Sequence, residues 1–255
     1  TILKVMRYYL FYNYFIMKIK NWDAYLWDCL EIMDNLIEQW IKVDAIITDP
    51  PYWTTACKRD QVIPFDKMRE RLNKLIKTNG AIVLFWSEPF SSALRMSNIK
   101  DFRYDIVWEK ERPTNIFFVK KQIAKVHEIV SIFYKKQPTY NPQMEKSMWV
   151  NRKLYDWNES KTHLRQKYQS SEEYDYSIRF PRSVLKINRD IKAKEFRHPT
   201  QKPVALIEYL IKTYTKEWEL VLDFTAGSFT TAIACENTNR KRICIEKDEW
   251  YYNIW

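Results

Sequence analysis

Residues 43–52, which read VDAIITDPPY, are the stretch that decides the fold. The first six are β-branched, small or apolar apart from one aspartate, and such a run favours a buried β-strand. Pro50 and Pro51 end that strand, because proline has no N–H to donate and its ring fixes φ. The sequence therefore predicts a strand that carries an aspartate, Asp49, in the turn at its carboxyl end.

Helical and strand patterns alternate outward from this stretch. Residues 65–76 show apolar residues at helical spacing, and Asn79-Gly80 is expected to cap that helix before a buried strand over 81–86. Further strands are expected at 104–108, 128–134, 220–224 and 242–246, and further helices at 203–214 and 230–236. This order predicts an α/β fold with a mostly parallel sheet covered by helices on both faces. In such sheets ligands bind beyond the carboxyl ends of the strands.

Asp49 has the chemistry to activate an amino group on a nucleobase. Such an amino group is a poor nucleophile, because its lone pair is delocalised into the ring. A carboxylate and a backbone carbonyl held side by side accept both N–H groups and localise that lone pair. Two rigid prolines supply the fixed geometry, and Tyr52 can stack on a base taken out of the duplex. An ordinary turn at a strand end is the alternative interpretation of these four residues.

A second motif, residues 222–231, reads LDFTAGSFTT and joins a strand through a turn to a helix. That layout brings a ligand close to backbone N–H groups at the start of the helix. Asp223 is placed to meet an ammonium group, and Glu246, at the end of the next strand, is placed to bind ribose hydroxyls. With Gly227 as its one glycine, the motif by itself also suits an ordinary strand–helix turn.

A third motif, His198-Pro199-Thr200-Gln201-Lys202-Pro203, opens the helix expected at 203–214. Taken with the other two and with residues 26–31 (LWDCLE), it makes the chain resemble the circularly permuted, beta-class DNA amino-methyltransferases of prophages and restriction–modification systems. The resemblance covers roughly residues 20–252 and implies a Rossmann-like methyltransferase fold. It also implies methyl transfer from S-adenosylmethionine to adenine N6, the target more often paired with Asp in this motif; cytosine N4 is the rival target.

The resemblance assigns roles residue by residue. It implies that the target base is held by Asp49, Pro50, Pro51 and Tyr52. It implies that the cofactor is bound by Asp28, Thr200, Gln201, Lys202, Pro203, Asp223, Ala226, Gly227, Ser228, Thr230, Thr231 and Glu246. No metal ion is expected in this reaction, and Cys57 is expected to be structural.

The net charge of +10 is concentrated in the middle of the chain. Residues 110–195 hold 19 Lys and Arg against 10 Asp and Glu, whereas the rest holds 23 against 22. A phosphate backbone would attract such a segment, although a solvated basic face is the plainer alternative. With the resemblance, this predicts a methyltransferase domain over 17–136 and 196–255, a target-recognition insert over 137–195 and an N-terminal extension over 1–16. Double-stranded DNA is the expected partner, and the family also admits a homodimer and a cognate restriction nuclease.

Composition excludes several other classes of protein. No run of about 18 apolar residues suggests a membrane span, and residues 1–16 lack the cleavage site of a signal peptide. The four cysteines form no CxxC pair, so we expect a reducing, cytoplasmic location.

Glycine is scarce, with two residues where average usage of ~7% predicts roughly 18. Trp27, Trp53, Trp86 and Phe229 stand where the resembled family commonly has glycine. Phe229 lies in the cofactor loop, where we expect a strained positive φ and a ring that obstructs the cofactor. A decayed gene, an altered translated sequence and a fold adapted to bulky residues are all open interpretations, and a DNA-binding homologue without cofactor is the rival function.

Overall fold

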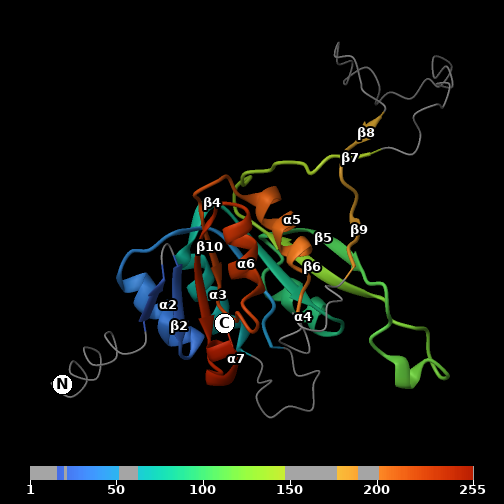
Figure 1. Cartoon of the computed structure of the whole chain (residues 1–255), viewed down its shortest axis with the longest axis horizontal. Coiled ribbons are helices and arrows are strands. Elements are labelled where there is room, and N and C mark those ends of the chain that lie inside the picture. The colour runs from blue at the N-terminus through green and yellow to red at the C-terminus, as the bar shows by residue number, and fades with distance from the viewer. Residues whose placement is uncertain (1–15, 20–21, 52–62, 147–176, 189–200, 255) are drawn as a thin grey trace. The chain divides into compact units, whose positions relative to one another are not determined.

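The computed structural model describes residues 16–19, 22–51, 63–146, 177–188 and 201–254 (Figure 1). The chain divides into two compact units. The larger unit contains everything except Pro142–Arg182, which form the smaller unit.

Nine strands of the described residues form one sheet in the larger unit, in the order β1-β2-β11-β10-β3-β4-β6-β5-β9. The central strands β2, β11, β10, β3 and β4 are mutually parallel, whereas β6 runs antiparallel to both β4 and β5. The strands are β1 (Ile16–Ile19), β2 (Trp22–Leu26), β3 (Val43–Thr48), β4 (Ile76–Trp86), β5 (Phe102–Glu109), β6 (His127–Phe133), β9 (Val184–Lys186), β10 (Leu220–Asp223) and β11 (Lys241–Glu246). The predicted mostly parallel sheet is confirmed.

Helices cover both faces of this sheet, as predicted. The helices are α2 (Cys29–Glu38), α3 (Phe65–Leu75), α4 (Phe90–Ser97), α5 (Val204–Tyr214), α6 (Thr230–Asn237) and α7 (Glu249–Ile254), with the 3-10 turn η1 (Ile116–Phe118). Alternate residues of β4 serve the two faces: Val83 and Phe85 pack in the cluster with α5 and α6, whereas Leu84 packs in the cluster with α2, α3 and α4. Both faces of β4 are therefore apolar, which explains its continuous hydrophobic run.

The predicted helix cap at Asn79-Gly80 is wrong. The helix ends at Leu75, and β4 begins at once with Ile76 and continues through Asn79 and Gly80 to Trp86. A Cβ on Gly80 would lie 2.7 Å from the backbone oxygen of Asp44 in the neighbouring strand β3. Gly80 is therefore required by a close approach of two strands and not by a turn.

The smaller unit, Pro142–Arg182, lies within the predicted insert at 137–195. Its described part contains the short antiparallel pair β7 (Glu145–Lys146) and β8 (Ile178–Arg179), in which Arg179 Nη2 lies 2.8 Å from Glu145 Oε2. The predicted domain boundaries and the recognition role of the insert stay predictions. Most of the predicted extension at 1–16 lies outside the described residues, and Ile16 is the first residue of β1.

Candidate active site at the carboxyl edge of the sheet

Four adjoining parallel strands end at one edge of the sheet, and each carries or is followed there by a carboxylate. In the order β2, β11, β10 and β3, these residues are Asp28, Glu246, Asp223 and Asp49. They come from positions far apart in the sequence, and parallel pairing brings them to the same edge. The structure thus brings together the four acidic residues that the sequence singled out.

Asp223 is the best-satisfied of these carboxylates. Thr48 Oγ1 donates to its Oδ1 over 2.7 Å, and Thr231 Oγ1 donates to its Oδ2 over 2.5 Å. The backbone N–H of Thr225 also donates to Oδ1, over 3.2 Å. Burial raises the pKa of this carboxyl, and the hydrogen bonds from Thr231 and Thr48 oppose that rise. Asp223 therefore links the end of β3 and the start of α6 to the turn that follows β10.

Glu246 holds the glycine turn of the second motif. Its Oε2 accepts from the backbone N–H of Gly227 over 2.6 Å, and its Oε1 accepts from that of Asp248 over 2.8 Å. Gly227 has a φ of 52°, a conformation that glycine adopts without steric cost. Burial raises the pKa of Glu246, and the two backbone N–H groups lower it. One carboxylate therefore fixes the shape of the turn that leads into α6.

Phe229 has the positive φ that the sequence predicted, at 57°. Its ring is fully buried in a small apolar cluster with Ala226, Ala232 and Cys244, and it makes an edge-on contact with Tyr252 at 5.8 Å between ring centroids. The phenyl group is thus part of the core beneath the turn. The expected obstruction of the cofactor by this ring stays a prediction.

Asp28 caps helix α2 at the same edge. Its Oδ1 accepts from the backbone N–H of Leu30 over 2.9 Å, which satisfies one of the free donors of the first helical turn. Its Oδ2 lies 3.2 Å from Lys247 Nζ. The backbone N–H of Trp27 donates to the carbonyl of Glu246 over 3.0 Å, so Asp28 and the glycine turn are held close together.

Asp49 is anchored on one side only. Lys202 Nζ donates to its Oδ2, whereas Oδ1 is buried and has no hydrogen-bond partner among the described residues. Burial raises the pKa of Asp49; Lys202 opposes that rise, and the nearby carboxylates of Glu128 and Asp223 add to it. An unpartnered buried acceptor is costly unless a ligand or water satisfies it, so Oδ1 is a candidate binding position.

Lys202 is held by a second carboxylate, Glu128 on β6, whose Oε2 lies 3.3 Å from Lys202 Nζ. Lys110, which follows β5, donates to the other oxygen of Glu128. Burial raises the pKa of Glu128, but the two lysines outweigh it and leave that pKa lowered. The sequence analysis did not single out Glu128 or Lys110. The signal that could have found them is a charged residue next to each of two predicted strands, at the same edge of the sheet.

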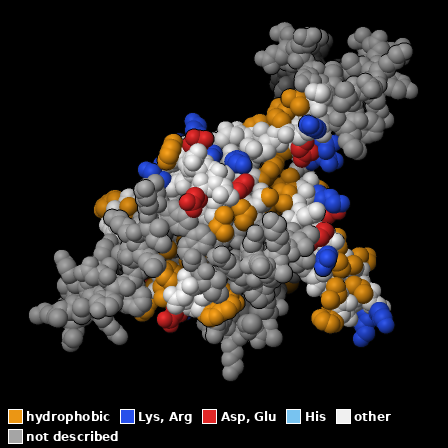
Figure 2. All heavy atoms as spheres, viewed as in Figure 1, with side chains coloured by type: hydrophobic (Ala, Val, Ile, Leu, Met, Phe, Trp, Pro, Cys, Tyr) orange, Lys and Arg blue, Asp and Glu red, His pale blue; other side chains and the backbone are white. Residues whose placement is uncertain are grey.

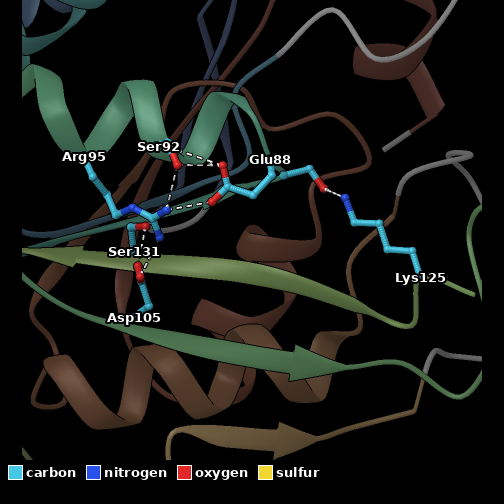
Figure 3. A network of polar contacts seen from close by, with 7 residues as sticks. Glu88, Ser92, Arg95, Asp105, Lys125 and Ser131 are labelled. Atoms are coloured by element: carbon cyan, nitrogen blue, oxygen red, sulfur yellow. Dashed lines mark hydrogen bonds and ion pairs between the residues drawn. The ribbon is translucent and has the colours of Figure 1, made fainter. Parts of the chain in front are cut away.

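The turn after β4 is also fixed by polar contacts (Figure 3). Arg95 of α4 lies 2.6 Å from both Glu88 and Asp105, and so joins this turn to β5. Lys125 Nζ donates to Ser87 Oγ over 2.6 Å, and so ties the segment before β6 to the end of β4. The turn after β4, the strand that pairs with β3, is therefore held in place by ion pairs and a hydrogen bond.

The remaining predicted residues are placed as follows. Pro50 and Pro203 are buried, and Pro203 occupies the N-cap of α5. Ser228 Oγ lies 3.0 Å from Thr230 Oγ1, in the turn at the start of α6. Pro51 and Gln201 are half-buried and Ala226 is buried, whereas Tyr52, Cys57, His198 and Thr200 lie outside the described residues.

Metal ligands and thiols are the remaining reactive groups in the part of the chain that the structure describes. No cluster of three or more His, Cys, Asp or Glu there has the arrangement of a metal site. Burial raises the pKa of Cys29 and of Cys235 to about 12, so neither thiol is a nucleophile at neutral pH. No described helix is both long and apolar enough to cross a bilayer.

Several known proteins are similar to this chain. The DNA adenine methyltransferase YhdJ of Escherichia coli (strain K12) is 28% identical over 83% of this chain and 74% of its own length. The type II methyltransferase M.HindIII of Haemophilus influenzae is 42% identical, but over 28% of this chain and 23% of its own length. The crystal structure of the M1.HpyAVI–SAM complex superposes with a TM-score of 0.62 at 26% identity, over 91% of this chain and 96% of that one.

The family itself follows from a longer match. The model of the DNA methylase family matches residues 43–255, from the first residue of β3 to the last residue of the chain. That span includes Asp49, the segment before α5 and the glycine turn. The beta-class subdivision suggested by the motif order stays a prediction. Because the match covers most of the chain and all but one of the carboxylates at the edge of the sheet, this protein belongs to the DNA methylase family.

Proposed function

We propose that this chain methylates N6 of adenine in double-stranded DNA, with S-adenosylmethionine as the methyl donor. The observation that carries the proposal is Asp49 Oδ1, a buried acceptor without a partner among the described residues, beside an Oδ2 that is already held. An adenine amino group placed against Oδ1 donates one N–H to it. That hydrogen bond localises the nitrogen lone pair and orients it for attack, and Asp49 is in position to receive the proton that the amino group releases.

Residues at the other three strand ends suit the cofactor. Glu246 and Asp28 offer carboxylates for the ribose and the nearby polar groups, and the turn at Gly227 brings backbone close to a ligand. S-adenosylmethionine supplies the electrophilic methyl group. Asp223 is assigned to shaping this site, because it is buried and accepts three hydrogen bonds from the chain, whereas Glu246 is half-buried and accepts two. Tyr52 and Thr200 keep the roles that the resemblance implies.

The loop between β5 and β6, residues 110–126, suits the DNA. Glu109 pairs with His127, so this loop leaves the sheet at the edge where Asp49 lies. Phe117 and Ile123 are about nine-tenths exposed, at 90% and 92%. Hydrophobic and basic side chains gather on this loop at the lower right of Figure 2. Lys120 and Lys121 of the loop are exposed. Lysines attract phosphates, and an exposed aromatic side chain can enter a groove or occupy the space of a displaced base.

The partner in this proposal is double-stranded DNA, which would place the protein in the cytoplasm. A homodimer and a cognate restriction nuclease stay predictions from the family resemblance. The predicted insert at 137–195 is proposed to read the target sequence, because it is basic, with 12 Lys and Arg against 8 Asp and Glu.

The test is incubation of the protein with DNA and S-adenosylmethionine, followed by mass spectrometry of the nucleosides. N6-methyladenine is expected; N4-methylcytosine would transfer the proposal to the rival target, and no methylated nucleoside would refute it. The Asp49→Asn variant should reduce product by a factor of about 100 or more, because asparagine is a weaker acceptor and takes no proton. Asp66→Asn, on the exposed face of α3, is the matched control and should keep full activity.

A further inference from the structure

Four charged side chains form a chain of alternating sign behind the proposed base site. Lys202 Nζ contacts both Asp49 and Glu128, and Lys110 Nζ contacts Glu128 from the other side. They belong to four different segments: the turn after β3, the segment before α5, strand β6 and the turn after β5. Only 7% of the Lys202 side chain and 12% of the Glu128 side chain are exposed.

Such a buried chain is not explained by stability alone. Removing charges from water costs several kcal/mol per ion, and the mutual attraction of the ions offsets this only when their geometry is good. The alternation of two lysines with two carboxylates neutralises the cluster. It also leaves one atom, Asp49 Oδ1, without a partner among the described residues. The arrangement therefore directs all of its hydrogen bonds to one side of Asp49 and leaves the other side open.

We propose that Lys202, held by Glu128, is a positioning residue that fixes Asp49 through Oδ2 and so presents Oδ1 to the amino group of the substrate. The proposal rests on the proposed function for the identity of that amino group. It differs from the role that the resemblance implied for Lys202, which was contact with the cofactor. Glu128 then acts one step further back, by keeping the ammonium group of Lys202 in place.

The groups around Asp49 make opposite predictions for two substitutions. Among the described residues, three charged groups face it: Lys202 favours its ionised form, whereas Glu128 and Asp223 disfavour it. Lys202→Met removes the favourable charge, so the pKa of Asp49 should rise and the acid limb of the activity profile should move to higher pH. Glu128→Gln removes an unfavourable charge, so the acid limb should move to lower pH.

The experiment measures kcat and KM against pH for the wild type, Lys202→Met and Glu128→Gln, with DNA and S-adenosylmethionine varied separately. For Lys202→Met, kcat should fall roughly 100-fold, as expected for a misplaced reacting group, while KM for S-adenosylmethionine stays near its wild-type value. Lys74→Met is the matched control, because Lys74 forms an exposed ion pair with Glu70 on α3. An increase of KM for S-adenosylmethionine with kcat unchanged would overturn the proposal, because Lys202 would then be a cofactor contact.

A second measurement separates this proposal from the proposed function. The carboxyl group of Asp49 is followed by carbon-13 NMR during a pH titration, and the Asp49→Asn variant identifies its signal. A higher Asp49 pKa in Lys202→Met than in the wild type supports the positioning role even if no methylated nucleoside is formed. An unchanged or lower pKa in a variant that circular dichroism shows to be folded overturns it.

Discussion

Replacement of Phe229 by glycine tests whether the chain has adapted to a bulky residue in its cofactor turn. Two effects of this substitution oppose one another. The backbone at Phe229 has a φ of 57°, which is unfavourable for any residue with a Cβ. The phenyl ring, in contrast, is completely buried against Ala226, Ala232 and Tyr252.

The relative size of the two effects decides the outcome. Removing a fully buried phenylalanine side chain costs about 3–5 kcal/mol, since the missing ring leaves a cavity. Relief of the left-handed conformation returns about 1–2 kcal/mol, because glycine has no Cβ. Phe229→Gly should therefore lower the free energy of unfolding by about 1–4 kcal/mol. The structure thus predicts a loss of stability although glycine is the usual residue of the family at this position.

Urea unfolding followed by tryptophan fluorescence measures this free energy. Trp218→Gly is the matched control, because Trp218 has a similar φ of 67° but is 63% exposed. Trp218→Gly should raise the free energy of unfolding by about 1 kcal/mol, since the strain is relieved and little buried surface is removed. If Phe229→Gly were as stable as the wild type or more stable, the ring would not contribute to the core, and the stabilising role assigned to its burial would be refuted.

Four further predictions concern other parts of the chain. Trp40 has a φ of 58° and is 87% exposed, so Trp40→Gly should also raise the free energy of unfolding by about 1 kcal/mol. The codon UGA is read as tryptophan in some genetic codes and as glycine in others. We therefore also expect that mass spectrometry of the protein purified from its own cells will find glycine at positions 40 and 218. Tryptophan at both positions would contradict this. Replacement of Lys120 and Lys121 by alanine should weaken DNA binding, measured by fluorescence anisotropy. The slope of log affinity against log salt concentration should fall by about one unit for each phosphate that is no longer neutralised. An unchanged slope would exclude these lysines from the interface. Glu246→Gln should weaken binding of S-adenosylmethionine in calorimetric titration, because the glycine turn loses a charged acceptor; unaltered affinity would remove Glu246 from the cofactor site.

Much of the fold could be predicted from local patterns. The residues of β3 were predicted to the residue, because a β-branched run followed by two prolines leaves the backbone few choices. The strands β10 and β11 and the helices α5 and α6 were placed to within one residue at each end. The pattern failed at Asn79-Gly80, where a dipeptide typical of turns lies inside β4, because pairing with β3 outweighs its local preference.

The sequence by itself determined which residues would stand at strand ends, and hence that Asp49, Asp223 and Glu246 belong to the functional edge. Those positions depend on hydrophobic periodicity and on proline, which act over a few residues. Only the tertiary structure decided what each side chain contacts there. Lys202 meets Asp49 and Glu128 because sheet register brings together segments that are far apart in the chain. Phe229 turns into the core because Tyr252, from the last helix, is there to pack against it. Such contacts arise from packing between distant segments, and no local pattern encodes them.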